Sequence, residues 1–322
     1  MLLATVIVLA FEGRSIRNSG EEMKQGWERT MVLSVGRPAG WVSDRFHLAE
    51  AKNALTGWAR TGDDLSGDGA GSFTATAAGA GGTAARGVQP VSPDAFDPVS
   101  VGDRPVAPAP LKTLLVTGDS MSQPLDAELA RRIARSADGV KTVRDPRIGT
   151  ALSQSEIVDW GKLSAAQVRR DRPNAVVVFI GANEGFPMRS GGREVSCCGR
   201  DWSAEYANRA RQMMNRYRAA GASRVYWMLL PAPRDPARQK ISRSVNAAIA
   251  VAAEPYRAQV RLVDLDAFFT PGGVYRAAMP VGGHQQLVRE PDGVHLNDRG
   301  ASLAADRVMA ALRADYGSAL AP

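Results

Sequence analysis

Residues 111–120 read LKTLLVTGDS, an apolar run that closes at Gly118 and is followed by Asp119 and Ser120. A run of this length bounded by a glycine predicts a buried β-strand. The next segment, ELARRIARSADG at 128–139, has its apolar residues at the spacing of one helical face. A strand, a glycine turn and then a helix form the beginning of a βα unit.

The same alternation continues towards the C-terminus. We expect further strands at 140–143, 175–180, 224–230 and 260–265, with an irregular glycine-containing stretch between the second strand and the third. Helical spacing of apolar residues recurs at 206–221, 241–249 and 304–312. The third strand, AVVVFI, is apolar throughout, as in parallel sheets that are buried on both faces. The pattern predicts an α/β domain: a doubly wound, mostly parallel five-stranded sheet flanked by helices, with ligands beyond the carboxyl ends of the strands.

Composition divides the chain into four segments. Residues 1–61 begin with an apolar run, and residues 62–110 are rich in Gly, Ala and Pro with little to bury. Residues 111–316 carry the strand and helix pattern, and residues 317–322 form a tail. A composition like that of 62–110 is typical of a disordered linker. We therefore expect one catalytic domain, 111–316, joined by a linker to an N-terminal segment.

The run LLATVIVLAF at 2–11 bears on localisation. It is about half of the roughly 20 residues that a membrane helix needs. It also lacks the flanking basic residues and the cleavage site of a signal peptide. Our hypothesis is that it forms the outer half of a membrane anchor whose first part lies upstream, which would place the protein outside the cytoplasm in the cell envelope. The alternative is a short N-terminal helix of a cytosolic protein.

The formal net charge of +7 raises the question of nucleic-acid binding. Only six of the 40 basic residues are lysines, the arginines are spread along the chain, and no basic block is interleaved with aromatic residues. We attribute the charge to composition bias and expect no nucleic-acid partner. Because metal-ligand spacings, dinucleotide fingerprints and phosphate-binding loops are all missing from the sequence, we expect neither a metal nor a cofactor. The sequence does not decide the oligomeric state.

Two predicted strands end in residues that can carry chemistry. Ser120 follows the first strand at a strand-to-helix turn, where a hydroxyl becomes exposed as a nucleophile must be. Ser and Asp are also ordinary helix N-caps. Asn183 lies in the sequence Gly-Ala-Asn-Glu after the third strand, and its amide at the same edge could donate a hydrogen bond to a developing oxyanion. A simple turn-forming role competes with that interpretation.

Asp292 and His295 lie in the sequence DGVH, just before the last predicted helix. A nucleophilic serine needs an imidazole that takes its proton and an acid that orients the imidazole. Of the three histidines in the chain, His295 is the one beside a carboxylate and near a predicted strand end. A solvated, helix-capping histidine is the alternative. Because the motifs occur in order at one edge of the predicted sheet, we interpret them as one site.

Taken together, Gly-Asp-Ser at 118–120, Gly-x-Asn at 181–183 and Asp-x-x-His at 292–295 resemble the blocks of the SGNH branch of the GDSL hydrolases. The resemblance covers about 111–316 and implies an SGNH/flavodoxin-like three-layer fold.

The implied roles are Ser120 as nucleophile, His295 as general base and then acid, and Asp292 as the group that orients the imidazole. The implied oxyanion donors are the Ser120 N–H, Gly149 after the second strand, and Asn183.

Four more residues enter as candidates. Glu184 stands where the family usually has Asp to brace the loop, and we include it with Arg289 as a substrate-binding residue. Arg289 would either reach an anionic substrate group or pair with Glu290 or Asp292 at the surface. The adjacent Cys197 and Cys198 either form a vicinal disulfide or remain free thiols. The sequences CCGRDW at 197–202 and VREPDGVHL at 288–296 resemble an uncharacterised, membrane-tethered group of bacterial SGNH proteins.

The leading functional hypothesis is hydrolysis of an O-acyl ester, acetyl first, on an envelope carbohydrate. Acyl transfer to a glycan would use the same acyl-enzyme with a sugar hydroxyl in place of water. A non-catalytic, envelope-binding module that keeps the fold is the alternative from another class. Loops at 185–202 and 270–291 should form the rim of the pocket and select the substrate.

Overall fold

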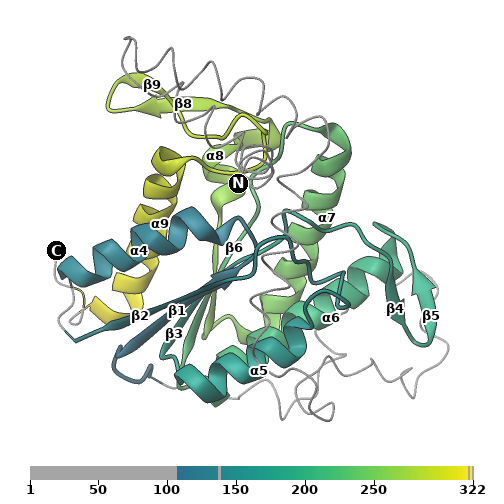
Figure 1. Cartoon of the computed structure of the whole chain (residues 1–322), viewed down its shortest axis with the longest axis horizontal. Coiled ribbons are helices and arrows are strands. Elements are labelled where there is room, and N and C mark those ends of the chain that lie inside the picture. The colour runs from purple at the N-terminus through teal and green to yellow at the C-terminus, as the bar shows by residue number, and fades with distance from the viewer. Residues whose placement is uncertain (1–106, 137–138, 318–319, 321–322) are drawn as a thin grey trace, which may run out of the picture. The chain divides into compact units, whose positions relative to one another are not determined.

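The computed structural model describes residues 107–136, 139–317 and 320 (Figure 1). The predictions for the N-terminal segment 1–61, for most of the linker 62–110 and for most of the tail lie outside the described residues. Within the described ranges, no helix is both long enough and apolar enough to cross a membrane.

Five parallel strands form the central sheet (Figure 1). In chain order they are β1 (Thr113–Gly118), β2 (Lys141–Pro146), β3 (Ala175–Phe179), β6 (Arg224–Met228) and β7 (Val260–Val263). Their order across the sheet is β2-β1-β3-β6-β7, and each neighbouring pair is parallel. The predicted five-stranded, doubly wound α/β fold is confirmed. Because the winding direction reverses between β1 and β3, the loops after these two strands diverge and leave room for a ligand.

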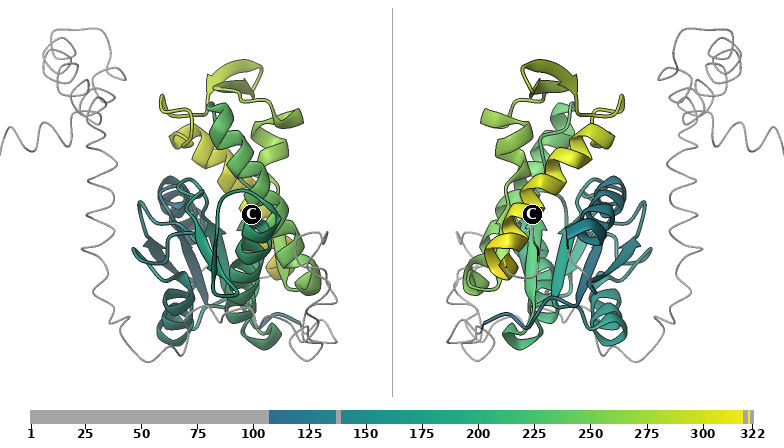
Figure 2. Two further views of the ribbon diagram at one scale, coloured as in Figure 1. Left: turned by 90° about the vertical axis from the view of Figure 1, so that its right-hand side faces the viewer. Right: turned by 90° about the vertical axis from the view of Figure 1, so that its left-hand side faces the viewer.

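In the described part of the chain, five long helices cover the sheet. They are α4 (Ser122–Ser136), α5 (Trp160–Asp171), α6 (Arg200–Tyr217), α7 (Pro236–Ala253) and α9 (Asp298–Tyr316). Helix α4 packs against α9, whereas α6 packs against both α5 and α7 (Figures 1 and 2). Right-handed connections from a sheet that winds in two directions put these two groups on opposite faces. The result is the expected three-layer sandwich.

The core lies between these layers. Strands β3 and β6 are buried at every position, as their largely apolar sequences indicate, although β6 begins with the charged Arg224. The largest fully buried side chains include Trp160, Trp202 and Trp227, one from each of α5, α6 and β6. A core of this kind holds the sheet rigid, so that the loops at its carboxyl edge have fixed starting points.

Helix α5 lies in the stretch that we expected to be irregular. Asp159 caps its N-terminus by accepting a hydrogen bond from the backbone N–H of Lys162. The buried face includes Trp160 and Leu163 but also the polar Ser164 and Gln167. An apolar period interrupted in this way is too weak to be detected in the sequence, and the prediction for this stretch was wrong.

Two hairpins stand where we expected loops. Strands β4 (Met188–Ser190) and β5 (Arg193–Val195) form one, and β8 (Ala278–Val281) and β9 (His284–Leu287) form the other. A Gly-Gly pair with positive φ at both residues makes each turn. Two such residues in succession suit the tight turns that connect antiparallel strands.

Candidate active site

The turn after β1 presents Ser120 because Gly118 lets two strands approach closely. The φ of Gly118 is 145°, and a Cβ at this position would lie 1.9 Å from the backbone oxygen of Phe179 on β3. Only glycine fits there, because any side chain would push apart β1 and β3, the two strands between which the winding direction reverses. Ser120 follows two residues later, partly exposed, directly before α4.

A continuous hydrogen-bonded chain joins Ser120, His295 and Asp292. The Ser120 hydroxyl oxygen is 2.8 Å from Nε2 of His295, and Nδ1 of the same ring is 2.6 Å from Oδ2 of Asp292. The three side chains that the motifs suggested, 175 positions apart at the extremes, therefore meet. The imidazole lies between a hydroxyl and a carboxylate, as a base that accepts a proton from the hydroxyl requires.

The loop before α9 holds the imidazole at this angle. Oδ1 of Asp292 accepts hydrogen bonds from the backbone N–H groups of Val294 at 2.8 Å and His295 at 3.1 Å. Gly293 has a φ of 76°, and a Cβ there would lie 2.6 Å from Cβ of Arg234. The short spacing in DGVH is thus a turn closed by the aspartate itself, which leaves Oδ2 free for the imidazole.

Asp292 and His295 each stabilise the charged form of the other. Burial alone would raise the pKa of Asp292, but the hydrogen bond and charge of His295 hold that pKa below its usual value. Burial alone would lower the pKa of His295, but the hydrogen bond and charge of Asp292 raise it above its usual value. The pair thus favours the imidazolium form, which is the form created when His295 takes a proton.

Asp119 is a residue of the site loops to which the sequence analysis gave no role of its own. Its carboxylate is fully buried, and it accepts hydrogen bonds from the backbone N–H groups of Gly181 at 2.8 Å, Ala182 at 2.7 Å and Met121 at 2.9 Å. Burial raises the pKa of this carboxyl group. Asp119 therefore ties the loop after β1 to the loop after β3. The signal in the sequence was the acid between Gly118 and Ser120.

The three proposed oxyanion donors lie in loops that are tied together. The side-chain amide of Asn183 donates to the carbonyl of Thr150, next to Gly149, at 3.2 Å. Gly149 has a φ of 78°, in the loop after β2. Among the described residues, no hydrogen bond within the protein uses the backbone N–H of Ser120 or of Gly149. Unused donors beside a candidate nucleophile can bind a developing negative charge.

Glu184 does not reach for a substrate but braces these loops. It is 6% exposed, and its carboxylate accepts from the backbone N–H groups of Leu152 at 2.8 Å and Ser153 at 3.0 Å. The hydroxyls of Ser153 and Tyr206 donate to it as well. Burial raises the pKa of Glu184. Four donors occupy both oxygens, so the structure puts this residue in the role that the family's acid has, despite the longer side chain.

Arg289 also differs from expectation. It is 4% exposed, and its guanidinium donates to the carbonyls of Val294 at 2.7 Å and Ala232 at 2.9 Å. Burial lowers the pKa of Arg289 to about 10. It therefore makes no surface ion pair with Glu290 or Asp292 among the described residues. Its position links the loop that carries His295 to the loop after β6.

The cysteines lie away from this network. Cys197 and Cys198 form a disulfide in the segment between β5 and α6. In the described ranges, no group of three or more His, Cys, Asp or Glu side chains is arranged to hold a metal ion.

Comparison with known proteins assigns the chain to a family. A model of a family described as a protein of unknown function, DUF459, matches residues 113–311. The chain belongs to the DUF459 family. The sequence matches none of the curated proteins. The three-layer α/β fold that the SGNH resemblance implied is the fold that the structure shows.

Solved structures similar to this DUF459 protein have low identity to it. The C-terminal catalytic domain of peptidoglycan O-acetyltransferase A from Streptococcus pneumoniae is 16% identical, with a TM-score of 0.41 over 66% of this chain and 96% of that one. Est24, a carbohydrate acetylesterase from Sinorhizobium meliloti, is 16% identical, with a TM-score of 0.40 over 62% and 99%. An aryl esterase from M. smegmatis is 12% identical, with a TM-score of 0.39 over 63% and 99%.

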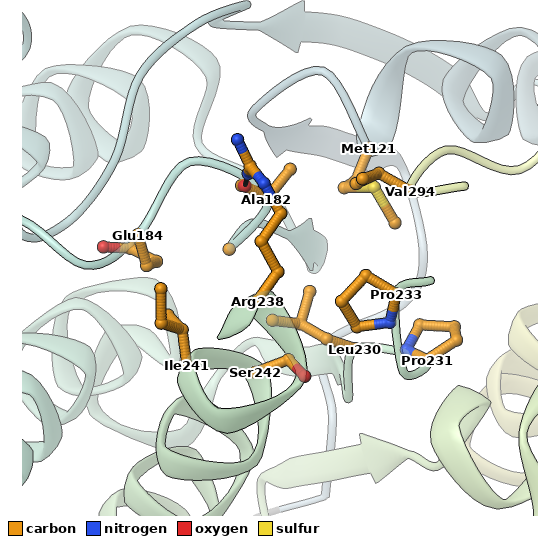
Figure 3. Close-up of a pocket in the computed structure, with 11 residues that line it drawn as sticks. Met121, Ala182, Glu184, Leu230, Pro231, Pro233, Arg238, Ile241, Ser242 and Val294 are labelled. Carbon is orange, nitrogen blue, oxygen red and sulfur yellow. Dashed lines mark hydrogen bonds between the residues drawn. The ribbon is translucent and has the colours of Figure 1, made fainter. Parts of the chain in front are cut away.

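A cleft that is open to solvent lies beside the turn that carries Ser120 (Figure 3). Three of its lining residues are neighbours of candidate site residues: Met121 follows Ser120, Ala182 precedes Asn183, and Val294 precedes His295. The remaining lining comes from Gly181 and Glu184 in the loop after β3, from the loop after β6 and from the first turns of α7. A group bound in this cleft would lie next to the Ser120 hydroxyl.

Proposed function

We propose that this DUF459 protein is a serine ester hydrolase that removes O-acyl groups, acetyl above all, from a cell-envelope carbohydrate through an acyl-enzyme. One observation carries the proposal. The hydroxyl of Ser120 and the carboxylate of Asp292 bind opposite nitrogens of the same imidazole, at 2.8 and 2.6 Å. A serine hydroxyl that served only as a helix cap would have no need of that arrangement.

In the first half of the proposed reaction, Ser120 Oγ attacks the ester carbonyl carbon while Nε2 of His295 takes the hydroxyl proton. The carbonyl oxygen becomes an oxyanion, which the N–H groups of Ser120 and Gly149 and the amide of Asn183 stabilise. Asp292 stabilises the imidazolium through Nδ1. His295 then returns the proton to the sugar oxygen as the C–O bond breaks. The products are a free sugar hydroxyl and an ester on Ser120.

In the second half, water replaces the sugar. His295 takes a proton from the water, the resulting hydroxide attacks the acyl carbon, and Ser120 Oγ leaves with the proton that His295 returns. The acid is released and the free enzyme is restored. A sugar hydroxyl in place of this water would make the protein an acyltransferase.

Release of acetate from O-acetylated polysaccharide tests the proposal. The full chain should release acetate at neutral pH, and the Ser120→Ala variant should release it slower by about 10⁴-fold or more. Ser203→Ala, at a partly exposed serine on α6, is the matched control and should keep its turnover. Acetate release unaffected by Ser120→Ala would contradict the assignment of the nucleophile. Loss of acetyl donor without free acetate, only when a glycan acceptor is present, would indicate transfer.

The proposed substrate lies outside the cytoplasm, and we propose the same location for the enzyme. The apolar run at 2–11 supports this. Fractionation of the source cells should find the protein with the envelope fraction, whereas recovery in the cytosol would contradict it.

A further inference from the structure

The cleft beside Ser120 has a predominantly apolar surface. Most of its side chains are apolar, namely those of Met121, Ala182, Leu230, Pro231, Pro233, Ile241 and Val294. An apolar wall favours carbon-rich groups and excludes water from the reacting centre. Such a surface by itself would accept any acyl or aromatic group of suitable size.

One cation breaks this apolar surface. Arg238 projects from the first turn of α7 across the cleft, and its Nη1 donates to the carbonyl of Ala182 at 2.9 Å (Figure 3). Ala182 immediately precedes Asn183, so the guanidinium is held near the proposed oxyanion donors. A single hydrogen bond leaves most of the N–H donors of the guanidinium unused.

The acidic groups nearby do not neutralise Arg238. Asp235 uses Oδ1 to cap α7, accepting from the backbone N–H groups of Ala237 and Arg238 itself. The carboxylate of Glu184 is occupied by donors of the loop after β2 and of α6, and in Figure 3 its oxygens point away from the guanidinium. Among the described residues, Arg238 makes no ion pair. Its charge is therefore available to a ligand.

A second exposed cation, Arg234, is adjacent in sequence to the cleft-lining Pro233. Its backbone N–H donates to the carbonyl of Gly293 at 2.9 Å, and its guanidinium lies 5.3 Å from the ring centre of Tyr275. Within the described ranges, it too makes no ion pair. Arg238 thus lines an apolar cleft beside the turn of Ser120, and Arg234 adds a second exposed positive charge next to a lining residue. Guanidinium is well suited to carboxylate and phosphate, which it binds through paired hydrogen bonds.

We propose that this cleft selects esters that carry an anionic group, a carboxylate or a phosphate, close to the scissile bond, and that Arg238 is the specificity-determining residue. The inference rests on the proposed function, since it assigns the substrate class of the same site. Apolar walls hold the carbon skeleton, and Arg238 binds the anion at the mouth, with Arg234 adding to the attraction. The anion can belong to the acyl group, as in a half-ester of a dicarboxylic acid, or to the alcohol, as in an acidic sugar.

Two matched pairs of esters test the proposal and separate these sources. Mono-p-nitrophenyl succinate against p-nitrophenyl butyrate places the charge on the acyl group. The second pair, 4-acetoxybenzoate against 4-acetoxybenzamide, places it on the alcohol. In each pair, kcat/KM is measured for the full chain after subtraction of the rate without enzyme. We expect the anionic ester of one pair to be preferred by about tenfold, since a charged hydrogen bond is lost without it.

The decisive variant is Arg238→Gln, which removes the charge and keeps a polar side chain near Ala182. It should reduce the anionic-to-neutral ratio to near one, and raised ionic strength should reduce the wild-type ratio in the same direction. Arg243→Gln is the matched control, because Arg243 is exposed on the same helix and does not line the cleft. The control should keep the wild-type ratio. An unchanged ratio in Arg238→Gln would overturn the proposal.

A binding measurement distinguishes failure of the anion-selectivity proposal from failure of the proposed esterase function. Calorimetric titration of the Ser120→Ala variant with the same four esters reports recognition without turnover. Tighter binding of an anionic ester that disappears in the Ser120→Ala/Arg238→Gln double variant supports the inference even if no ester is hydrolysed. Equal binding of the anionic and neutral esters overturns it even if the enzyme is an active esterase.

Discussion

Two polar networks follow the strands of the sheet, one largely buried and one partly exposed beside the cleft. The Asp145 network joins Thr117, Asp145, Gln167 and Tyr217. Gln167 donates to the Thr117 hydroxyl and to Asp145 at 3.0 Å each, and Tyr217 donates to Gln167 at 2.6 Å. The site network joins Ser120, His295 and Asp292.

Shifted pKa values occur in both networks and do not distinguish them. Burial alone would raise the pKa of Asp145, but the hydrogen bond from Gln167 and the charge of Arg147 lower it. The two networks differ in how exposed their side chains are to solvent and in whether hydrogen-bond donors beside them are unused. Gln167 is fully buried with both ends of its amide bonded, whereas the His295 side chain is 29% exposed and the N–H groups of Ser120 and Gly149 are unused by the described residues. A satisfied network stabilises, and an unsatisfied one beside a cleft can bind a transition state.

The strongest way to test this comparison is Asp292→Asn. The variant keeps the shape of the loop but removes the charge that favours imidazolium. We expect a loss in kcat/KM on the order of 10⁴-fold for p-nitrophenyl acetate.

The dependence of activity on pH shows in which direction Asp292 shifts the pKa of His295. Acylation needs neutral His295, so activity should rise with pH through a value above that of an ordinary histidine, because Asp292 raises the pKa of His295. In Asp292→Asn this limb should move to lower pH. A limb that stays in place would show that the profile reports another group.

A smaller effect is expected from Asn183→Ala, which removes one proposed oxyanion donor. The loss in kcat should be about 10²–10³-fold with a modest change in KM. Thermal unfolding serves as the control, because the amide makes only one hydrogen bond to the described residues, to Thr150. A change confined to KM would place Asn183 in ground-state binding instead.

The smallest effect on activity should come from Tyr217→Phe in the Asp145 network. The substitution leaves the Gln167 oxygen without its donor, which costs about 1–3 kcal/mol of unfolding free energy. Turnover at 25 °C should stay within about twofold of the wild type. Denaturant unfolding checks the predicted loss of stability and ester hydrolysis checks the predicted retention of activity, both measured on the same preparation. If Tyr217→Phe lost activity without stability, the distinction between the networks would fail.

The sequence predicted the fold, and it brought the candidate site residues to one edge of the sheet, for a clear reason. An unbroken apolar strand such as β3 indicates a parallel sheet, and parallel strands bring their following loops to one edge. Ser120 and Asn183 could therefore be placed together without knowledge of any contact. The turn closed by Asp292 is local, and its three-residue spacing is visible in the chain.

The rest depended on contacts between distant segments. The hydrogen-bond partners of Arg289 could not be predicted because its carbonyl partner at Ala232 is 57 positions away, and nothing in the sequence around it shows that bond. Asp119 was read as part of a motif, although its bonds to Gly181 and Ala182 are what join the two loops. Arg238 carried no signal at all, because its position across the cleft follows from the packing of α7.

The central claim is that Ser120 becomes acylated, and intact mass after rapid quenching measures this directly. The full chain, mixed with p-nitrophenyl acetate and quenched in acid within the first turnover, should gain the mass of one acetyl group. Peptide mapping should place it on Ser120, and Ser120→Ala should gain none. Turnover of the ester with no acetyl on Ser120, or the same adduct in the alanine variant, would contradict the account.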